Sequence, residues 1–276
     1  MIPLQRPPLD HKTAGLLAKA HGRLPEVGLT EAVARKAWKD ASGTRGRVAE
    51  ALPAMASGIE RCMYCSESFG TAIDHHEPLN HAPRRVFDWY NHLLACAFCN
   101  THAKGGAFPH DKAGNPLLVD PTADEPADHF RLSLTSGEYH CLTERGCASI
   151  DVFRLNRGSL RHGRLDAVGQ CLDTLAKCAE YLANDDKAEV EQRIRRLGRQ
   201  PFADVLQELR RIADRPKAGV VLGNDAALAA LRTLYTPLTA KPLFIPKQER
   251  HEPNCRSWRM AEPTGPSGGV GAGAPR

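Results

Sequence analysis

The sequence has no apolar run long enough to cross a bilayer, no apolar core of a signal peptide near its start, and no internal repeat. Its first residues, Met1–Pro8, are too short and too rich in proline for a secretion signal. We therefore expect a cytoplasmic protein with no membrane partner. A strong charge bias is also missing. The formal net charge of +5 permits a nucleic-acid partner without requiring one.

The cysteine usage argues against a disulfide framework. There are nine, an odd number, and four of them are spaced like metal ligands. The remaining ones show no such pattern; they are Cys141, Cys147, Cys171, Cys178 and Cys255. This usage fits a reducing cytosol better than an oxidising compartment.

Four cysteines form two CxxC pairs, Cys62–Cys65 and Cys96–Cys99. One such pair alone would be compatible with buried thiols or with a redox motif. Two pairs separated by a few tens of residues favour one Zn²⁺ bound tetrahedrally by all four thiolates. Such a closed site leaves no open coordination position, so we expect the zinc to be structural.

Between the two pairs lies the run Asp74-His75-His76. Histidines in a surface turn are the simpler interpretation, and for this run alone they would be preferred. Its place inside the zinc region favours a hydrolytic site, in which a histidine deprotonates water and Asp74 binds Mg²⁺ or another divalent cation. We expect a short strand to lead into Asp74. Neighbouring strand side chains point to opposite faces, so the chain must bend here if Asp74 and His75 are to face one way.

Two asparagines and a lysine complete the candidate site. Asn100 follows the zinc ligand Cys99 directly, so it could donate an amide oxygen to the cation on Asp74. Lys104 lies four residues on, where a lysine could meet a nucleic-acid phosphate. Asn91 could hold the Asp-His loop through backbone hydrogen bonds, although a plain turn residue is a fair alternative.

These residues resemble the HNH endonuclease family, which has a ββα-metal fold. The resemblance implies that His75 is the general base, Asp74 the first metal ligand and Asn91 the central asparagine. Asn100 stands where the family has its last histidine. His102 is an alternative third ligand, although on a helix it would face away from Asn100.

A narrower resemblance covers about residues 50–165. Over these residues the chain is similar to the HNH subunits of Septu-type and retron-associated anti-phage systems. The segments that carry it are Trp89–Cys96, Cys99–Gly105, Phe108-Pro109, Leu117–Pro121 and Leu155–Arg157. In that family the nuclease works with a separate ATPase subunit, so the resemblance implies an ATPase partner and a DNA substrate.

Local signals outline the remaining chain. Thr30 precedes a helix-forming run, and Asn224 caps the start of another. Alternating residues on either side of Ser136-Gly137 predict a hairpin. The arginines of 193–199 and 210–211 could follow a DNA backbone, but solvated helix faces balanced by glutamates are the preferred interpretation.

We expect an α+β fold that is mainly α: a ββα-metal (HNH) core with a structural four-cysteine zinc site, flanked by helical segments. The expected parts are a helical segment 1–55, the nuclease core 56–120, a connector with a hairpin 121–157, a helical region 158–245 and a disordered tail 246–276. The predicted activity is metal-dependent hydrolysis of DNA phosphodiester bonds. The alternative is a zinc-stabilised nucleic-acid-binding or adaptor module whose nuclease site is inert.

Overall fold

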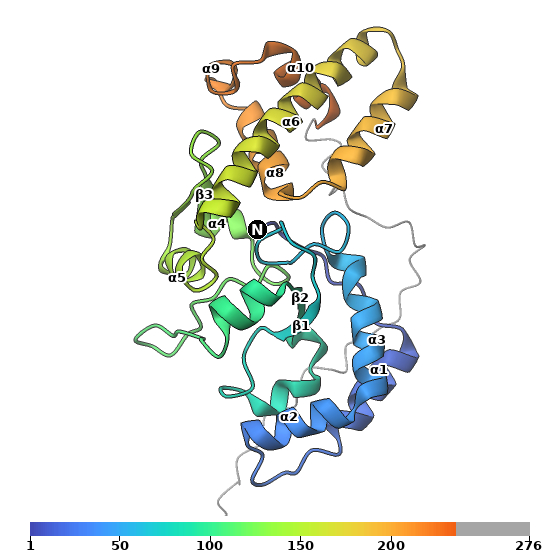
Figure 1. Ribbon diagram of the computed structural model, residues 1–276, viewed down its shortest axis with the longest axis vertical. Coiled ribbons are helices and arrows are strands. Elements are labelled where there is room, and N and C mark those ends of the chain that lie inside the picture. Colours follow the sequence, from blue (N-terminus) through green and yellow to red (C-terminus); the bar gives the residue numbers. More distant parts are fainter. Residues whose placement is uncertain (236–276) are drawn as a thin grey trace, which may run out of the picture. The chain divides into compact units, whose positions relative to one another are not determined.

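Helices make up most of the regular structure in the computed structural model, which describes residues 1–235 (Figure 1). The predicted tail 246–276 lies outside the described residues. In chain order the elements are α1 (His11–His21), α2 (Glu31–Asp40), α3 (Ser42–Ala51), η1 (Leu52–Met55), β1 (Ala72–His75), η2 (Pro83–Phe87), η3 (Trp89–Asn91), β2 (His92–Ala95), η4 (Phe98–Lys104), α4 (Pro126–His129), β3 (Phe130–Leu132), β4 (Tyr139–Cys141), α5 (Glu144–Val152), α6 (Gly158–Ala183), α7 (Lys187–Gly198), α8 (Ala203–Ala213), α9 (Ala218–Leu222) and α10 (Asp225–Leu234).

The predicted helix caps are confirmed. The Thr30 side chain accepts a hydrogen bond from the backbone N–H of Val33 at the start of α2. Asn224 accepts from the N–H of Ala227 at the start of α10. Each side-chain oxygen satisfies one of the N–H groups that the first helical turn leaves without a partner.

Strands β1 and β2 form a two-stranded antiparallel sheet between the two CxxC pairs. The register places Asp74 opposite Leu93 and His75 opposite His92. The predicted strand before Asp74 is therefore present, and it extends through His75. A backbone hydrogen bond from Met63 to Leu94 joins the first CxxC loop to β2. Short sheets of this kind need outside support, and this bond to the first CxxC loop supplies part of it.

The predicted hairpin is also present, as β3 and β4. Gly137 has a φ of 69° in its turn, a conformation that glycine adopts without steric cost. The side chain of Asn156 holds Tyr139 of β4 through both its backbone N–H and its carbonyl oxygen. Helices α4 and α5, on either side of the hairpin, were not predicted.

A disulfide between Cys141 and Cys147 joins the end of β4 to α5, with a Cα–Cα distance of 4.9 Å. This disulfide was not expected, because the cysteine usage favoured a reducing cytosol over a disulfide framework. The strand end and the helix bring together two thiols that are six residues apart in the chain. Cys171 and Cys178 are unpaired and buried on α6, where they act as small apolar side chains.

The C-terminal described helices pack around α6, which contacts α7, α8 and α10 (Figure 1). Arg164 on α6 is completely buried and forms an ion pair with Asp204 on α8. Its guanidinium also donates to the carbonyl oxygens of Gly137 and Leu155, so it ties the hairpin to both helices. The fold is a mainly helical α+β structure with small sheets. None of its described helices has the length and apolar character that a membrane span requires.

Candidate functional site

The four cysteines of the CxxC pairs converge on one point. The Sγ atoms of Cys62, Cys65, Cys96 and Cys99 lie within 4.8 Å of one another, and all four residues are buried. Tetrahedral Zn–S bonds of about 2.3 Å place neighbouring sulfur atoms about 3.8 Å apart. The Sγ atoms of Cys65 and Cys96 are 4.0 Å apart, close to that value. The cluster can therefore hold a zinc ion in the predicted way.

Asp74 lies inside the protein, at 3% exposure. The Nζ atom of Lys104 is 2.9 Å from its Oδ1 and 2.7 Å from its Oδ2. The hydroxyl of Tyr64 donates to Oδ2 at 2.5 Å. A carboxylate has about four lone-pair positions, and these three bonds leave one on Oδ1. The carboxylate is therefore charge-balanced within the protein while retaining one free acceptor position.

Lys104 is placed differently from the expected phosphate contact. Its side chain is at 0% exposure, and Nζ donates to the carbonyl oxygen of His75 at 2.6 Å as well as to Asp74. Burial lowers the pKa of the Lys104 ammonium, and the neighbouring Asp74 charge opposes that shift. The lysine is thus an internal counter-charge and not a surface group.

His75 is partly exposed and oriented through one ring nitrogen. Its Nε2 lies 3.1 Å from the carbonyl oxygen of Val86. A carbonyl oxygen only accepts hydrogen bonds, so Nε2 carries the proton and Nδ1 of the neutral ring carries the lone pair. The surrounding protein removes much of the ring's hydration, which lowers the pKa of His75 below its usual value. The imidazole is therefore neutral near pH 7, with an acceptor nitrogen available.

A second histidine and a tryptophan support this ring. His92, directly across the sheet, also bonds the carbonyl of Val86 through Nε2, at 3.0 Å. Trp38 of α2 stacks on His92 with ring centroids 4.9 Å apart and meets the His75 ring edge-on at 5.1 Å. His75 is thus held by a backbone carbonyl, by its cross-strand neighbour and by an aromatic ring from the N-terminal helices.

His76 occupies a different environment. It is buried, its Nδ1 lies 3.4 Å from the hydroxyl of Tyr64, and its ring meets Phe108 edge-on at 5.6 Å. Burial lowers the pKa of His76. The bend expected near the Asp-His pair falls at His76 and Glu77, one residue beyond the strand. The bend expected between Asp74 and His75 is therefore absent, although both residues line one cavity.

Asn91 makes the backbone contacts expected of it. It is completely buried, and its Oδ1 accepts from the N–H of Glu77 at 2.8 Å. Its Nδ2 donates to the carbonyl oxygens of Glu77 and Arg85 at 3.0 and 3.3 Å. The side chain therefore fixes the loop that follows His75 and lies away from any open surface.

A cavity of about 220 Å³ brings Asp74, His75 and Asn100 together. Arg35 and Trp38 of α2 form part of its wall. The Asn100 side chain makes no hydrogen bond within residues 1–235, so its amide oxygen is free. His102 does not line this cavity; it is exposed and its Nδ1 lies 3.2 Å from the carbonyl oxygen of Ala97.

Two residues of α2 and the role of Tyr64 were not predicted from the sequence. Arg35 and Trp38 precede the resemblance to the HNH subunits, and only tertiary packing of α2 against η2 brings them to the site. Tyr64 lies inside the first CxxC pair. That position could have suggested its contact with Asp74, because the zinc ligands on both sides fix it close to the sheet.

Three arginines of the C-terminal helices pair with acidic neighbours, in agreement with the preferred interpretation. Ion pairs link Arg193 to Glu189 and Arg195 to Glu191 on α7. On α8, Arg211 pairs with Glu208. Arg196, Arg199 and Arg210 form no ion pair within residues 1–235, so the basic charge of these helices is partly compensated.

Comparison with known proteins supports one relationship. No family model matches the chain, and no solved structure matches it. Among curated proteins the chain is similar to the Septu protein PtuB of Bacillus thuringiensis, with 28% identity over 133 residues. The match covers 45% of this chain and 48% of that protein, so it spans about half the length of the relative. The chain is thus a distant relative of a Septu protein.

Proposed function

We propose that this protein is a metal-dependent endonuclease of the HNH type that cuts DNA and serves as the nuclease subunit of a Septu-type anti-phage defence system. The observation that carries the proposal is that Asp74, His75 and Asn100 line the same cavity. The distant similarity to a Septu protein supports the defence setting. In this proposal β1, β2 and the helical turn η4 are the ββα-metal core.

His75 would act as the general base. Its neutral ring presents Nδ1 as an acceptor because Nε2 is committed to the carbonyl of Val86. A lowered pKa keeps this nitrogen unprotonated near neutral pH. His75 takes one proton from a water molecule, the resulting hydroxide attacks the phosphorus, and the bond from phosphorus to the 3′ oxygen breaks. The departing oxygen takes a proton from solvent, so the reaction is a balanced hydrolysis.

Asp74 and Asn100 would hold the divalent cation, since each offers an oxygen atom as a ligand. The carboxylate keeps one acceptor position on Oδ1, and the amide oxygen of Asn100 is free. Oxygen ligands of this type suit Mg²⁺. When bound, such an ion would polarise the phosphate and neutralise developing negative charge. Because Lys104 already balances the charge of Asp74, these residues would bind a cation weakly and depend on the substrate phosphate.

One observation favours a second candidate function, a zinc-stabilised nucleic-acid-binding or adaptor module with an inert nuclease site. The buried Lys104 ammonium contacts both carboxylate oxygens of Asp74. If Lys104 keeps cations away from this carboxylate, the cavity would be unable to support hydrolysis.

Cleavage assays separate the two candidates. Purified protein is incubated with supercoiled plasmid, linear duplex DNA and RNA, each with Mg²⁺ and with EDTA. The proposal predicts nicking or cutting of DNA with Mg²⁺ and none with EDTA. If the protein binds nucleic acid but does not cleave it under any of these conditions, with or without the ATPase partner, the inert module is favoured.

The partner is tested separately. The reading frames beside the gene are sequenced, and an adjacent ATPase is co-expressed with this chain carrying an affinity tag. The proposal predicts co-purification of the ATPase and cleavage by the complex. Neighbouring genes without an ATPase, together with cleavage by the chain alone, would contradict the partner assignment and leave the nuclease assignment intact.

A further inference from the structure

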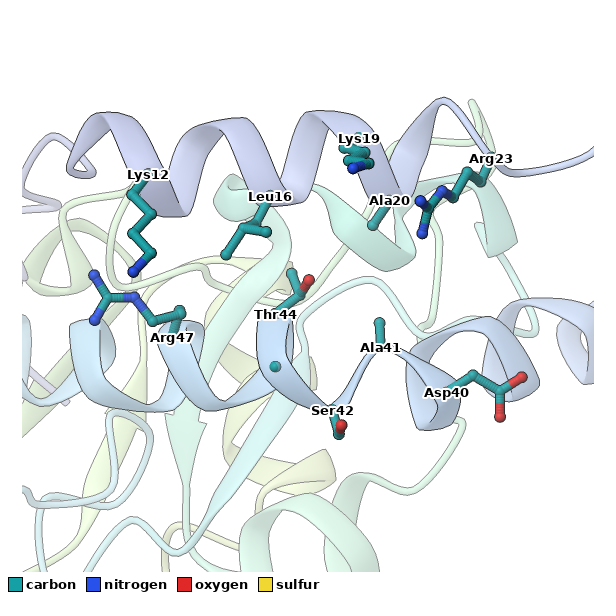
Figure 2. A pocket seen from close by; sticks show the side chains of 11 residues that line it. Lys12, Leu16, Lys19, Ala20, Arg23, Asp40, Ala41, Ser42, Thr44 and Arg47 are labelled. Carbon is teal, nitrogen blue, oxygen red and sulfur yellow. The ribbon is translucent and has the colours of Figure 1, made fainter.

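The N-terminal helices contain a second cavity, distinct from the one that holds His75. It has a volume of about 430 Å³ and lies between α1 and α3, and the end of α2 closes one side (Figure 2). We call it the α1–α3 pocket. Its charged lining consists of Lys12, Lys19, Arg23, Asp40 and Arg47.

The positive charges of this pocket are poorly compensated. Lys12, Lys19 and Arg23 are exposed and form no ion pair with any residue of 1–235. Arg47 pairs with Glu50 and lies 3.6 Å from Asp10, while the one acidic side chain in the lining, Asp40, pairs with Lys36. Arg193, Arg195 and Arg211 of α7 and α8 differ in this respect, since glutamates on the same helices pair with them.

The cations also face one another. Figure 2 shows the ends of Lys12 from α1 and Arg47 from α3 pointing toward each other across the pocket. Arg47 is already paired with Glu50 and Asp10, whereas Lys12 has no ion pair within residues 1–235 and leaves a positive charge on this space. The first turn of α3 borders the same space, and its N-cap residue Ala41 makes no side-chain capping bond. The N–H groups of that turn add to the positive character.

The N-terminal segment concentrates the charge of the whole chain. Residues 1–51 contain nine lysines and arginines against five aspartates and glutamates, a net charge of +4 out of the +5 of all 276 residues. An excess of this kind on one segment attracts polyanions.

We propose that the α1–α3 pocket binds the phosphate backbone of a nucleic acid and guides it to the His75 cavity, an inference that rests on the proposed nuclease function. The length of the basic row argues for a polyanion and against a single phosphate. Lys12 and Lys19 are seven residues apart on α1, about 10 Å along its axis, and Arg23 follows two residues after the helix ends. One DNA strand advances about 3.4 Å per phosphate, so the two lysines alone span on the order of three phosphates.

Helix α2 connects the two cavities. Arg35 and Trp38 line the cavity of His75, whereas Asp40 and Ala41 line the α1–α3 pocket. Three residues, about 4.5 Å of helical rise, separate Trp38 from Ala41. A strand held at the α1–α3 pocket therefore needs little additional length to reach the candidate catalytic residues.

The test measures binding without cleavage. Fluorescently labelled 20-nucleotide single-stranded DNA, duplex DNA, RNA and poly-glutamate are each titrated with protein in EDTA, and anisotropy is followed from about 50 to 200 mM salt. The test variant is Lys12→Gln/Lys19→Gln/Arg23→Gln. The matched control is Arg199→Gln/Arg215→Gln/Lys217→Gln, which removes three exposed cations without an ion pair elsewhere in residues 1–235. Circular dichroism and thermal melting establish that each variant folds.

The inference predicts that the test variant binds at least one of these nucleic acids roughly tenfold or more weakly, with a salt slope lower by about 2 to 3, because each lost phosphate contact removes somewhat less than one unit of slope. The control should bind within about twofold of wild type. His75→Ala should bind like wild type, so a failure of catalysis is read separately from a failure of binding.

Three outcomes would overturn the inference. One is that the wild type binds none of these nucleic acids. Another is that the folded test variant binds them as tightly as the control does. The last is that the test variant loses binding to poly-glutamate but keeps its affinity for nucleic acid, which would identify the pocket as a site for an acidic protein. Cleavage of plasmid by the wild type in any of these cases would leave the proposed nuclease function standing.

Discussion

Lys104 and Asp74 form a buried ion pair in which Nζ lies 2.7 and 2.9 Å from the two carboxylate oxygens. The pair joins η4, which contains Cys99 of the second CxxC pair, to strand β1. The hydroxyl of Tyr64 in the first CxxC pair bonds the same carboxylate. One acidic side chain thus links both cysteine loops to the strand that carries His75.

Removing the lysine should destabilise the fold. Lys104→Met leaves the Asp74 carboxylate buried without its counter-charge, which typically costs about 3–5 kcal/mol. Urea denaturation followed by circular dichroism measures the loss. The double variant Asp74→Asn/Lys104→Met removes both charges and should be more stable than Lys104→Met alone. Equal midpoints for Lys104→Met and wild type would show that the pair contributes little.

Removing one thiolate should release the metal. Cys96→Ser is expected to reduce zinc from one ion per chain to nearly none and to lower the melting temperature, since binding of a structural zinc contributes directly to folding. Elemental analysis of purified protein gives the metal content, and Cys171→Ser is the control because Cys171 lies outside the cluster. Folded Cys96→Ser protein with a full complement of zinc would contradict the assignment.

Stability should fall as the pH drops below about 6.5. Burial, and next the nearby His75, hold the pKa of His92 well below its usual value, and Arg6 and Arg85 act in the same direction. The unfolded chain takes up a proton near pH 6.5, whereas folded His92 stays neutral to a lower pH. Each such histidine then costs up to about 1.4 kcal/mol per pH unit between the two pKa values.

Urea denaturation at pH 7.5, 6.5 and 5.5 measures this slope. Between pH 6.5 and 5.5, His92→Gln should lose less free energy of unfolding than wild type, because the substitution removes one histidine whose pKa is lowered in the folded state. An unchanged or steeper slope in His92→Gln would mean that other groups dominate the pH dependence.

Asn100 should determine the Mg²⁺ concentration that cleavage requires. Asn100→Ala removes the free amide oxygen in the cavity, so cleavage should need a several-fold higher Mg²⁺ concentration or fail, while wild type should need Mg²⁺ on the order of millimolar. Cleavage rates measured across Mg²⁺ concentrations test this. His102→Ala, outside the cavity, should behave like wild type; if it is inactive and Asn100→Ala is active, His102 is the third ligand.

The spacing of the cysteines was enough to predict their convergence, because two CxxC pairs have few ways of forming a closed tetrahedral site. The alternation of a strand was enough to place Asp74 and His75 on β1. Lys104 could not be placed in this way. The turn of η4 is a π-helix, closed by a bond from the N–H of Gly105 to the carbonyl of Asn100, five residues earlier. Its wider turn gives Lys104 a different direction from the one that α-helical spacing predicts.

The wall formed by α2 was also beyond prediction. Arg35 and Trp38 lie more than thirty residues before Asp74, and no spacing rule relates them to the CxxC loops. Their position depends on the packing of α2 against η2, which is set by the whole N-terminal segment. Tertiary packing of this kind leaves little trace in local sequence pattern.

The most direct test of the central claim is the single-turnover rate of DNA cleavage with Mg²⁺ for wild type, His75→Ala, His76→Ala and the exposed control His162→Ala. If His75 is the base, His75→Ala should lose about 10²–10⁴-fold in rate. It should keep its fold and zinc, and His162→Ala should match wild type. Cleavage by His75→Ala at the wild-type rate would contradict the account. If a folded His76→Ala is the one variant that loses activity, His76 is the base.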